Sequence, residues 1–254
     1  GLAAARLLGP RSREQPNSLI RVPELLQVLV VAAERGWQPP PALQFVAVGG
    51  ARVSLELLGR ADAAGIPVYE GYGLSECASV VCLNTPAARR TGTVGRPLPH
   101  VRVRVDASGQ VHVAGNTMLG YLGDPPRAPH DEIATGDLGV FDADGYLQLH
   151  GRMGNRFITG FGRNVSPEWV ECEISQRLGG RPVLVHGEAR PYVVALVGAS
   201  AHEAPDAAVE AAIAAANAVL PNYAQVRGWA RAPGPFTPAD GTLTANGRLR
   251  RQQI

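Results

Sequence analysis

The chain has 254 residues, of which 45% are hydrophobic and 18% are charged, and its formal net charge at pH 7 is +2. This composition supplies enough apolar surface for a core and for more than one domain. The small net charge argues against a nucleic-acid partner. All 24 basic residues are arginines, so the sequence contains no lysine.

A parallel α/β section is predicted for the first part of the chain. Residues 19–35 have the composition of a helix, with Pro23 in its first turn. Residues 43–50 form an apolar run that ends in two glycines, 54–64 suit a helix, and 66–73 suit the next strand. A strand, a glycine turn, a helix and a strand make a βαβ unit, and ligands of such sheets bind beyond the carboxyl ends of the strands.

The segment YEGYGLSECASV, Tyr69 to Val80, allows two interpretations. One is a glycine turn followed by a helix start at Ser75, with Glu76 placed favourably for the helix dipole. The other is a nucleotide site, in which a loop presents an aromatic face, a hydroxyl and a carboxylate. The segment alone leaves both open.

From about Thr91 the pattern becomes antiparallel. Residues 101–115 and 139–151 alternate with a period of two on both sides of turns that contain glycine. This pattern predicts two hairpins and a barrel-like antiparallel section after the parallel one.

The remainder after Gly151 is predicted to be a small α+β domain. A glycine loop at 157–164 precedes a helix with Ser166 as its N-cap and Pro167 at its first position. Two strands and an alanine-rich helix follow, at 182–187, 192–199 and 206–220.

The cysteines and histidines limit the chemistry that can be expected. Cys77, Cys82 and Cys172 are an odd number without metal-ligand spacing, which indicates reduced, mostly buried thiols in a cytoplasmic protein. The six histidines are scattered, which argues against a zinc site or a nucleophile activated by histidine. We expect neither a signal peptide nor a membrane span in the opening segment.

Six stretches carry a family resemblance, in the order VGGARVS, YEGYGLSE, GTVGRPLP, ATGDLG, GRMGNRFITGFGRNVSPEWVE and LTANGRLRR. Together they resemble the second half of the adenylate-forming superfamily, which includes acyl-CoA synthetases, peptide-synthetase adenylation domains and luciferases. Each stretch alone is weak evidence for the resemblance, but the ordered set covers nearly the whole chain. The resemblance implies that residues 1–151 are the C-terminal part of a large AMP-binding domain and that 152–254 are a small mobile domain.

The resemblance also implies a reaction and its cofactors. A carboxylic acid, which we expect to be a fatty acid, reacts with ATP and Mg²⁺ to give acyl-AMP and pyrophosphate, and coenzyme A then displaces AMP. Proximity and electrostatic neutralisation supply most of the catalysis in such a mechanism, so few acid–base residues are expected.

Roles for individual residues follow from the same resemblance. Tyr72 would stack on adenine, Ser75 would bond the α-phosphate, and Glu76 would help to hold Mg²⁺, a hard cation that takes carboxylate oxygen. Asp137 would accept hydrogen bonds from both ribose hydroxyls. Arg152 would make a second contact with ribose and phosphate.

Further positions complete the implied sites. Small or strand-end residues would line the adenine and acyl sites, namely Gly49, Gly50, Ala51, Glu70, Gly71 and Gly73. The loop that resembles the wall of a pantetheine tunnel contains Gly160, Phe161 and Gly162. Arg248, with Ser75 and Glu76, completes the candidate catalytic set.

Three features depart from the family pattern. The phosphate-gripping loop and the N-terminal half of such an enzyme lie upstream of anything in this sequence, so activity of these residues alone is doubtful. Gly154 stands at the hinge position. Arg248 stands where the family has its adenylation lysine, and the planar guanidinium is not interchangeable with an ammonium group.

Two alternatives to the CoA ligase remain. One is a ligase that loads the acyl group onto the pantetheine of a carrier protein. The other is a degenerate, non-catalytic relative that binds an adenylate or a partner chain, which Arg248 and the lack of the phosphate-gripping loop in this sequence favour. A Rossmann dinucleotide enzyme is a poor alternative, because no strand is followed by GxGxxG.

Overall fold

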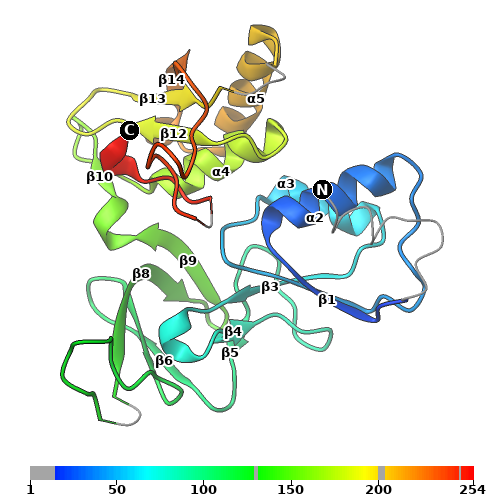
Figure 1. Cartoon of the computed structure of the whole chain (residues 1–254), viewed down its shortest axis with the longest axis vertical. Helices are drawn as coiled ribbons and strands as arrows, with labels where there is room; N and C mark the ends of the chain where they lie inside the picture. The colour runs from blue at the N-terminus through cyan, green and yellow to red at the C-terminus, as the bar shows by residue number, and fades with distance from the viewer. Residues whose placement is uncertain (1–14, 129–130, 200–203, 246) are drawn as a thin grey trace. The chain divides into compact units, whose positions relative to one another are not determined.

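The computed structural model describes residues 15–128, 131–199, 204–245 and 247–254 (Figure 1). The chain divides into two compact units, Gly1–Met153 and Gly154–Ile254. Both units combine helices and strands, which confirms the predicted α/β class with a parallel-sheet portion and a barrel-like antiparallel section.

The first unit begins with a five-stranded mixed sheet. Its strands lie in the order β1 (Ser18–Arg21), β2 (Phe45–Val48), β3 (Val68–Tyr72), β4 (Cys82–Leu83) and β5 (Arg96–Pro97). The first three are parallel, and the last two add antiparallel. The helices α2 (Pro23–Glu34) and α3 (Leu55–Ala63) pack against the parallel strands through a shared apolar core (Figure 1). The predicted βαβ unit is therefore confirmed.

The predicted helix over 19–35 is wrong in its first residues. Residues Ser18–Arg21 form β1, which pairs in parallel with β2, and the helix begins only at Pro23. A residue that precedes proline is disfavoured in the α region, and Val22 accordingly has an extended backbone. The proline therefore separates a strand from a helix within one apolar run.

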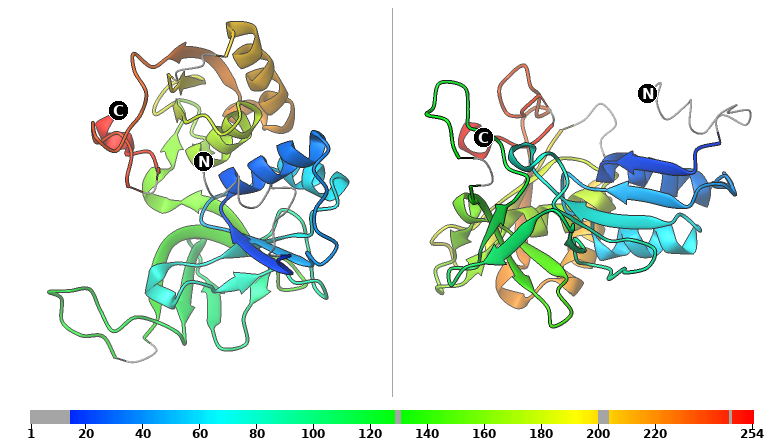
Figure 2. Two further views of the ribbon diagram at one scale, coloured as in Figure 1. Left: turned by 45° about the vertical axis from the view of Figure 1, so that its right-hand side comes forward. Right: turned by 90° about the horizontal axis from the view of Figure 1, so that it is seen from below.

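A four-stranded antiparallel sheet completes the first unit. Its order is β6 (Arg102–Val105), β7 (Gln110–Ala114), β8 (Ile133–Phe141) and β9 (Leu147–Arg152), and Figure 2 shows how it curls. Both predicted hairpins are confirmed by the β6–β7 and β8–β9 pairings. Cys77 and Cys82 are free thiols, buried as expected in an apolar cluster that includes residues of this sheet.

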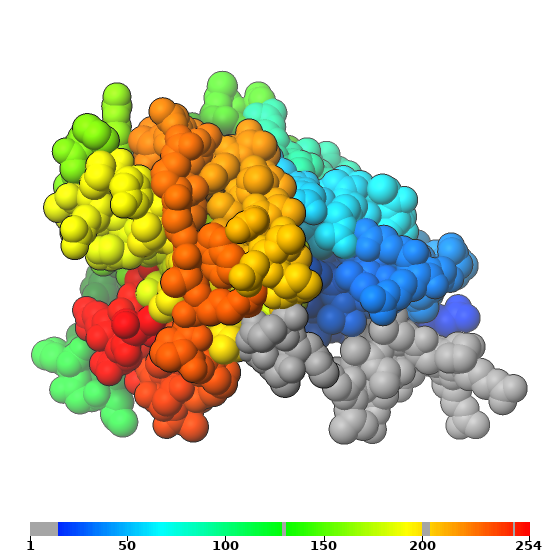
Figure 3. Space-filling model, turned by 90° about the horizontal axis from the view of Figure 1, so that it is seen from above, coloured from blue at the N-terminus to red at the C-terminus, as the bar shows by residue number. Residues whose placement is uncertain are grey.

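The second unit contains a hairpin, a three-stranded sheet and two helices. The hairpin pairs β10 (Phe157–Ile158) with β11 (Asn164–Val165), and the sheet has the order β12 (Val183–His186), β13 (Val193–Val197) and β14 (Val226–Arg231). The helices are α4 (Pro167–Arg177) and α5 (Asp206–Val219). Figure 3 shows α5, in gold, beside the orange segment that contains β14.

The predicted strands and helices of this unit are confirmed, and so is Ser166 at the N-cap position of α4. The Ser166 side chain, however, makes no capping bond. Its hydroxyl donates to Glu168 Oε2 at 3.0 Å instead. The fixed φ of Pro167 at the first helical position starts the helix without that bond.

Single 3₁₀ turns lie between or after these elements. They are η1 (Ser75–Cys77), η2 (Met153–Asn155), η3 (Asn222–Ala224) and η4 (Arg251–Gln253). Among the described residues, no helix combines the length and the apolarity needed to cross a membrane.

Candidate functional site

Two predicted glycine motifs meet at one edge of the parallel sheet. Because β2 and β3 run in parallel, Gly49 and Gly71 come at corresponding strand ends. A Cβ atom on Gly49 would lie only 3.0 Å from the carbonyl oxygen of Gly71. Gly50 follows with φ +84°, and Ala51 is exposed. The small residues therefore permit a close backbone approach at the place where ligands of parallel sheets bind.

Gly73 is required by the backbone of the same edge. A Cβ atom at this position would lie 1.4 Å from the carbonyl oxygen of Ser79. Ala78 and Ser79 both have positive φ, so the chain folds back tightly after the 3₁₀ turn. Gly73 is thus fixed by the loop itself, whether or not a ligand is bound.

The predicted helix start at Ser75 is wrong. Ser75–Cys77 form a single 3₁₀ turn, and the left-handed Ala78 ends it. Without a helix, no macrodipole favours an anion at this point. The structure instead presents an exposed Ser75 on a loop, and the nucleotide site, the second of the two interpretations of this segment, stays a prediction.

The Glu76 carboxylate accepts a hydrogen bond from an exposed tyrosine that was not predicted from the sequence. Tyr121 donates its hydroxyl to Glu76 Oε1 at 2.8 Å, and the Met118 amide donates to the Glu76 carbonyl at 2.7 Å. The described residues contain no group of three or more His, Cys, Asp or Glu side chains that could hold a metal. The binding of Mg²⁺ by Glu76, with phosphates and water as the other ligands, stays a prediction.

Asp137 is the meeting point of three strands. Tyr72, the last residue of β3, donates its hydroxyl to Asp137 Oδ2 at 2.6 Å. Arg152, the last residue of β9, donates from Nε to Asp137 Oδ1 at 2.8 Å. Asp137 lies in β8 directly opposite Arg152 in the strand register. The fold thus brings together three predicted site residues that are far apart in sequence.

Burial makes this contact strong. Tyr72 is 8% exposed and Asp137 is 9% exposed, whereas the Arg152 side chain is 54% exposed. Burial first, and the neighbouring Asp137 carboxylate second, raise the pKa of Tyr72, so its hydroxyl remains a proton donor. The stacking of Tyr72 on adenine stays a prediction.

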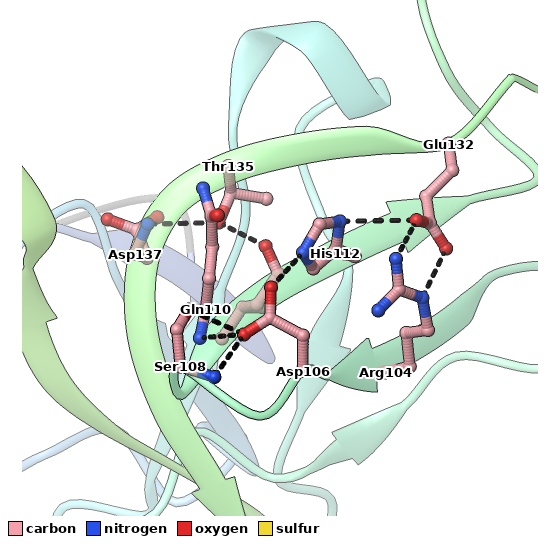
Figure 4. A network of polar contacts seen from close by, with 9 residues as sticks. Arg104, Asp106, Ser108, Gln110, His112, Glu132, Thr135 and Asp137 are labelled. Atoms are coloured by element: carbon pink, nitrogen blue, oxygen red, sulfur yellow. Dashed lines mark hydrogen bonds and ion pairs between the residues drawn. The ribbon is translucent and has the colours of Figure 1, made fainter.

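Thr135 also holds Asp137, and its signal in the sequence is weak. Its hydroxyl donates to the Val111 carbonyl at 2.8 Å and accepts from the Asp137 amide at 3.1 Å (Figure 4). The signal is the threonine two residues before the aspartate in the stretch ATGDLG. Strand neighbours that stabilise a candidate ligand have no distinctive sequence pattern of their own.

A polar network continues along the same sheet. His112 contacts Asp106 Oδ2 through Nε2 at 2.7 Å and Glu132 Oε1 through Nδ1 at 3.1 Å (Figure 4). Arg104 donates from Nε to Glu132 Oε2 at 2.8 Å. These contacts tie β6 and β7 to the residue that precedes β8, and they stabilise the scaffold around Asp137.

Glu70 points its carboxylate into the protein. Its Oε2 accepts from the Gly92 amide at 2.9 Å, and its backbone carbonyl accepts from Asn84 Nδ2 at 3.2 Å. Burial raises the pKa of Glu70 to about 7, against the opposing influence of the Gly92 hydrogen bond and of Arg52 and Arg89. Glu70 thus links the end of β3 to the loop before β5.

The predicted pantetheine loop is the turn of the β10–β11 hairpin. Gly162 has φ +72°, and the Gly160 amide donates to the Arg190 carbonyl at 2.8 Å. Phe161, between them, is 76% exposed. The turn therefore presents an aromatic side chain to solvent on a well-fixed backbone.

Arg248 also lies on a tight turn of the second unit. Its amide donates to Thr244 Oγ1 at 3.0 Å, and its carbonyl accepts from the Thr244 amide at 2.8 Å. An isolated bridge between Leu243 and Leu249 closes this turn. The Arg248 residue is exposed.

The chain that follows Arg248 is anchored in the second unit. Arg251 pairs with the carboxylate of Glu171 and donates to the Val185 carbonyl at 3.4 Å. The Val185 amide in turn donates to Glu171 Oε1 at 2.8 Å. Glu171 is only 8% exposed, and burial raises its pKa, while Arg251 and the Val185 amide lower it. Sequence reasoning did not single out this pair.

A family model described as AMP-binding enzyme matches residues 2–122 of the chain. Among curated proteins, the chain is similar to the long-chain-fatty-acid–CoA ligase FadD15 of Mycobacterium bovis. The two are 29% identical over 234 residues, which are 81% of this chain and 39% of that ligase. The chain is also 32% identical over 182 residues to the 2-succinylbenzoate–CoA ligase of Enterococcus faecalis, and the match covers 65% of this chain and 36% of that enzyme.

Solved structures agree with the fold. O-succinylbenzoate coenzyme A synthetase (MenE) from Bacillus subtilis, in complex with the acyl-adenylate intermediate OSB-AMP, superimposes with a TM-score of 0.77 at 21% identity. The match covers 98% of this chain and 53% of that one. The same enzyme in complex with ATP and magnesium gives a TM-score of 0.75 at 20% identity, covering 99% and 54%. The chain thus spans about two fifths of the length of FadD15 and about half of the solved MenE chain.

Proposed function

The chain belongs to the AMP-binding enzyme family, and from this premise we propose that it forms the C-terminal portion of an AMP-forming acid–thiol ligase. In this reaction a carboxylate oxygen attacks the α-phosphorus of ATP, which forms acyl-AMP and releases pyrophosphate. The thiol of CoA then attacks the acyl carbon and releases AMP. Residues 1–151 would belong to the large AMP-binding domain and 152–254 to the small mobile one.

The observation that carries this proposal is the contact of Tyr72 and Arg152 with the two oxygens of Asp137. A carboxylate has about four acceptor positions, so each oxygen can still accept a hydroxyl. The two ribose hydroxyls of an adenylate supply two such donors. The adjoining edge carries only small residues, namely Gly49, Gly50, Ala51, Gly71 and Gly73, and the base would lie beside it.

The phosphate part of the site would be formed by the loop after β3. Ser75 would donate its hydroxyl to the α-phosphate, and Glu76 would hold Mg²⁺ together with phosphate oxygens and water. When bound, Mg²⁺ would neutralise part of the phosphate charge. Tyr121 would orient the Glu76 carboxylate through the hydrogen bond that it donates.

The second unit would supply residues for both half-reactions. Arg248 would neutralise charge between the acid and the phosphate during adenylation, in the place of the usual lysine. The turn with Gly160, Phe161 and Gly162 would border the pantetheine arm of CoA. Gly154 would allow the backbone rotation between the two half-reactions.

The curated relatives support a carboxylic acid with a large apolar part as the substrate. We propose a fatty acid, because the FadD15 relative is named as a long-chain-fatty-acid–CoA ligase. The succinylbenzoate ligases make an aromatic acid the second substrate to test. The free cysteines support a cytoplasmic location.

The decisive experiment measures AMP release from ATP by the protein extended upstream through its N-terminal half. Long-chain, short-chain and aromatic acids are each supplied with and without CoA, for the wild type and for Arg248→Lys. We expect AMP release that requires both a fatty acid and CoA. Release with a pantetheinylated carrier protein but not with CoA would instead identify the carrier-loading alternative.

Arg248→Lys distinguishes an intact site that the arginine has inactivated from a protein without ligase activity. Release by Arg248→Lys alone would mean that the site is intact and that the arginine has silenced adenylation. No release by either folded protein would overturn the ligase proposal and leave the non-catalytic, adenylate-binding alternative.

A further inference from the structure

Tyr72 contacts the candidate site through its hydroxyl. The hydroxyl donates to Asp137 Oδ2 at 2.6 Å, while Arg152 Nε donates to Asp137 Oδ1 at 2.8 Å. Each oxygen of the carboxylate is thus held by one donor, and the two donors come from different strands, β3 and β9. The direction of the carboxylate plane is fixed from both sides.

The two donors do not hold the carboxylate equally. Arg152 has a side chain that is 54% exposed, so solvent screens its charge and competes for its hydrogen bonds. Tyr72 is 8% exposed, and its ring packs in the core beside Cys77 and Val81. A hydrogen bond from a buried group to a charged acceptor is among the stronger contacts in a protein.

Loss of the hydroxyl would free the carboxylate. The torsion about the Cβ–Cγ bond of an aspartate has a broad distribution, so the backbone of Asp137 does not by itself set the plane of the carboxylate. With only Oδ1 held by a screened arginine, the plane could turn away from a pair of adjacent hydroxyls. A single hydroxyl would still find one oxygen.

We propose that Tyr72 is a positioning residue, whose hydroxyl aligns the Asp137 carboxylate with the 2′- and 3′-hydroxyls of a ribonucleotide and so sets the preference for ribose over deoxyribose. This inference rests on the proposed function, because it requires that Asp137 binds the ribose. It adds a selective role to a residue whose ring was expected only to stack on adenine.

The test is isothermal titration of the 254-residue chain with AMP, 2′-deoxy-AMP and 3′-deoxy-AMP. The variants are Tyr72→Phe and, as a matched control, Tyr69→Phe, which lies on the same strand and stacks on Phe45 at 4.7 Å between ring centroids. We expect the wild type and Tyr69→Phe to prefer AMP over each deoxynucleotide by about tenfold.

Tyr72→Phe should lower the affinity for AMP by about tenfold and the affinity for each deoxynucleotide by less than about threefold, so that the preference for AMP falls below about threefold. A purely structural role would lower all three affinities by the same factor and keep the preference, which would overturn the inference. A wild type that binds AMP without any preference for ribose would overturn it as well. A wild type that binds no adenylate would instead contradict the adenylate site itself.

A second measurement needs no substitution and covers the case in which Tyr72→Phe does not fold. A phenolic proton in a short bond to a carboxylate gives a separate downfield proton resonance in the NMR spectrum. We expect AMP to shift the Tyr72 resonance more than 2′-deoxy-AMP does at saturating concentrations. Equal shifts with both nucleotides would contradict the positioning role.

Discussion

The candidate residues of the two units are held in different ways. In the first unit they are held by side-chain contacts with one another and with neighbouring strands, as in the bonds of Tyr72 and Arg152 to Asp137. In the second unit Phe161 and Arg248 lie exposed on tight turns whose backbone is fixed. The first arrangement orients polar groups before a ligand arrives, whereas the second fixes only the point from which a side chain extends.

This difference predicts where substitutions act. In the first unit, changes at candidate residues should affect folding and binding together, because the same contacts serve both. In the second unit, changes at the turn residues should leave folding intact, and only the anchors of the turns should affect it. The following predictions test this contrast, beginning with the largest effect.

Gly73→Ala should have the largest effect. The added Cβ would overlap the Ser79 carbonyl oxygen, which is backbone and cannot move without unfolding the loop. We expect a loss of more than about 4 kcal/mol in the free energy of unfolding, a range that single substitutions rarely reach. Urea denaturation followed by circular dichroism measures it.

Gly154→Ala is the matched control in the second unit. A Cβ atom there would meet nothing within 4 Å. The free energy of unfolding of the variant should therefore lie within about 0.5 kcal/mol of the wild-type value. Similar losses in the two variants would show that the glycines of the two units are under the same constraint, and the contrast would fail.

Arg251→Gln tests the anchor of the Arg248 turn. It removes the partner of the buried Glu171 carboxylate and leaves it with the Val185 amide. Removal of one member of a buried ion pair costs about 3 kcal/mol. The comparison with Arg250→Gln, at the exposed neighbouring position, isolates the pair from a general loss of charge.

The loss in Arg251→Gln should depend on pH in a definite direction. Without Arg251, burial raises the pKa of Glu171 further, so the folded state favours the protonated carboxyl. A raised pKa stabilises the fold below the unfolded value and ceases to do so as pH rises. The deficit should therefore be larger at pH 8 than at pH 5, and amide exchange at Val185 should accelerate. A deficit that is independent of pH would mean that the pair does not anchor the tail.

Local patterns were sufficient to predict much of the fold. The hairpin over residues 101–115, the helix that begins at Pro167 and the alanine-rich helix all follow from signals within a few residues of one another. The strand before Pro23 was missed because Leu19 and Ile20 continue the apolar run of the helix. Only the parallel partner β2 determines that these residues are extended.

The site was predicted as a set of residues but not as a set of contacts. Tyr72 and Asp137 are 65 positions apart, and no local pattern states that one donates to the other. Glu171 and Arg251 are 80 positions apart and were missed for the same reason. A helix start at Ser75, one of the two interpretations of its segment, is excluded because the chain returns tightly at Ala78 and Ser79, and this return depends on a close approach to Gly73. Long-range packing, rather than propensity, decides each of these cases.

Glu70 gives the first unit a dependence on pH of its own. Burial raises the pKa of Glu70 from 4.5 to about 7, so the folded state favours the neutral carboxyl. Its contribution to stability is complete below about pH 4.5 and is lost as the pH rises through 7, with a total of up to about 3 kcal/mol. Relative to Glu70→Gln, the wild type should lose stability between pH 5 and pH 8. Parallel pH profiles in urea denaturation would contradict this.

The smallest expected effect, at Phe161, makes the contrast sharpest. Phe161→Ala should change the free energy of unfolding by less than about 0.5 kcal/mol, because the side chain is 76% exposed. Phe157→Ala, four residues earlier, removes a 7% exposed ring from the core and should cost about 3 kcal/mol or more. Thermal unfolding of the two variants tests the difference, and comparable losses would mean that Phe161 packs as a structural residue.

If Phe161 contributes nothing to folding, a slower CoA-dependent step of Phe161→Ala in the upstream-extended protein can be attributed to contact with the thiol substrate. The same inference cannot be made for Tyr72, whose ring and hydroxyl serve the fold as well, and this is why its test depends on a ratio of affinities rather than on activity.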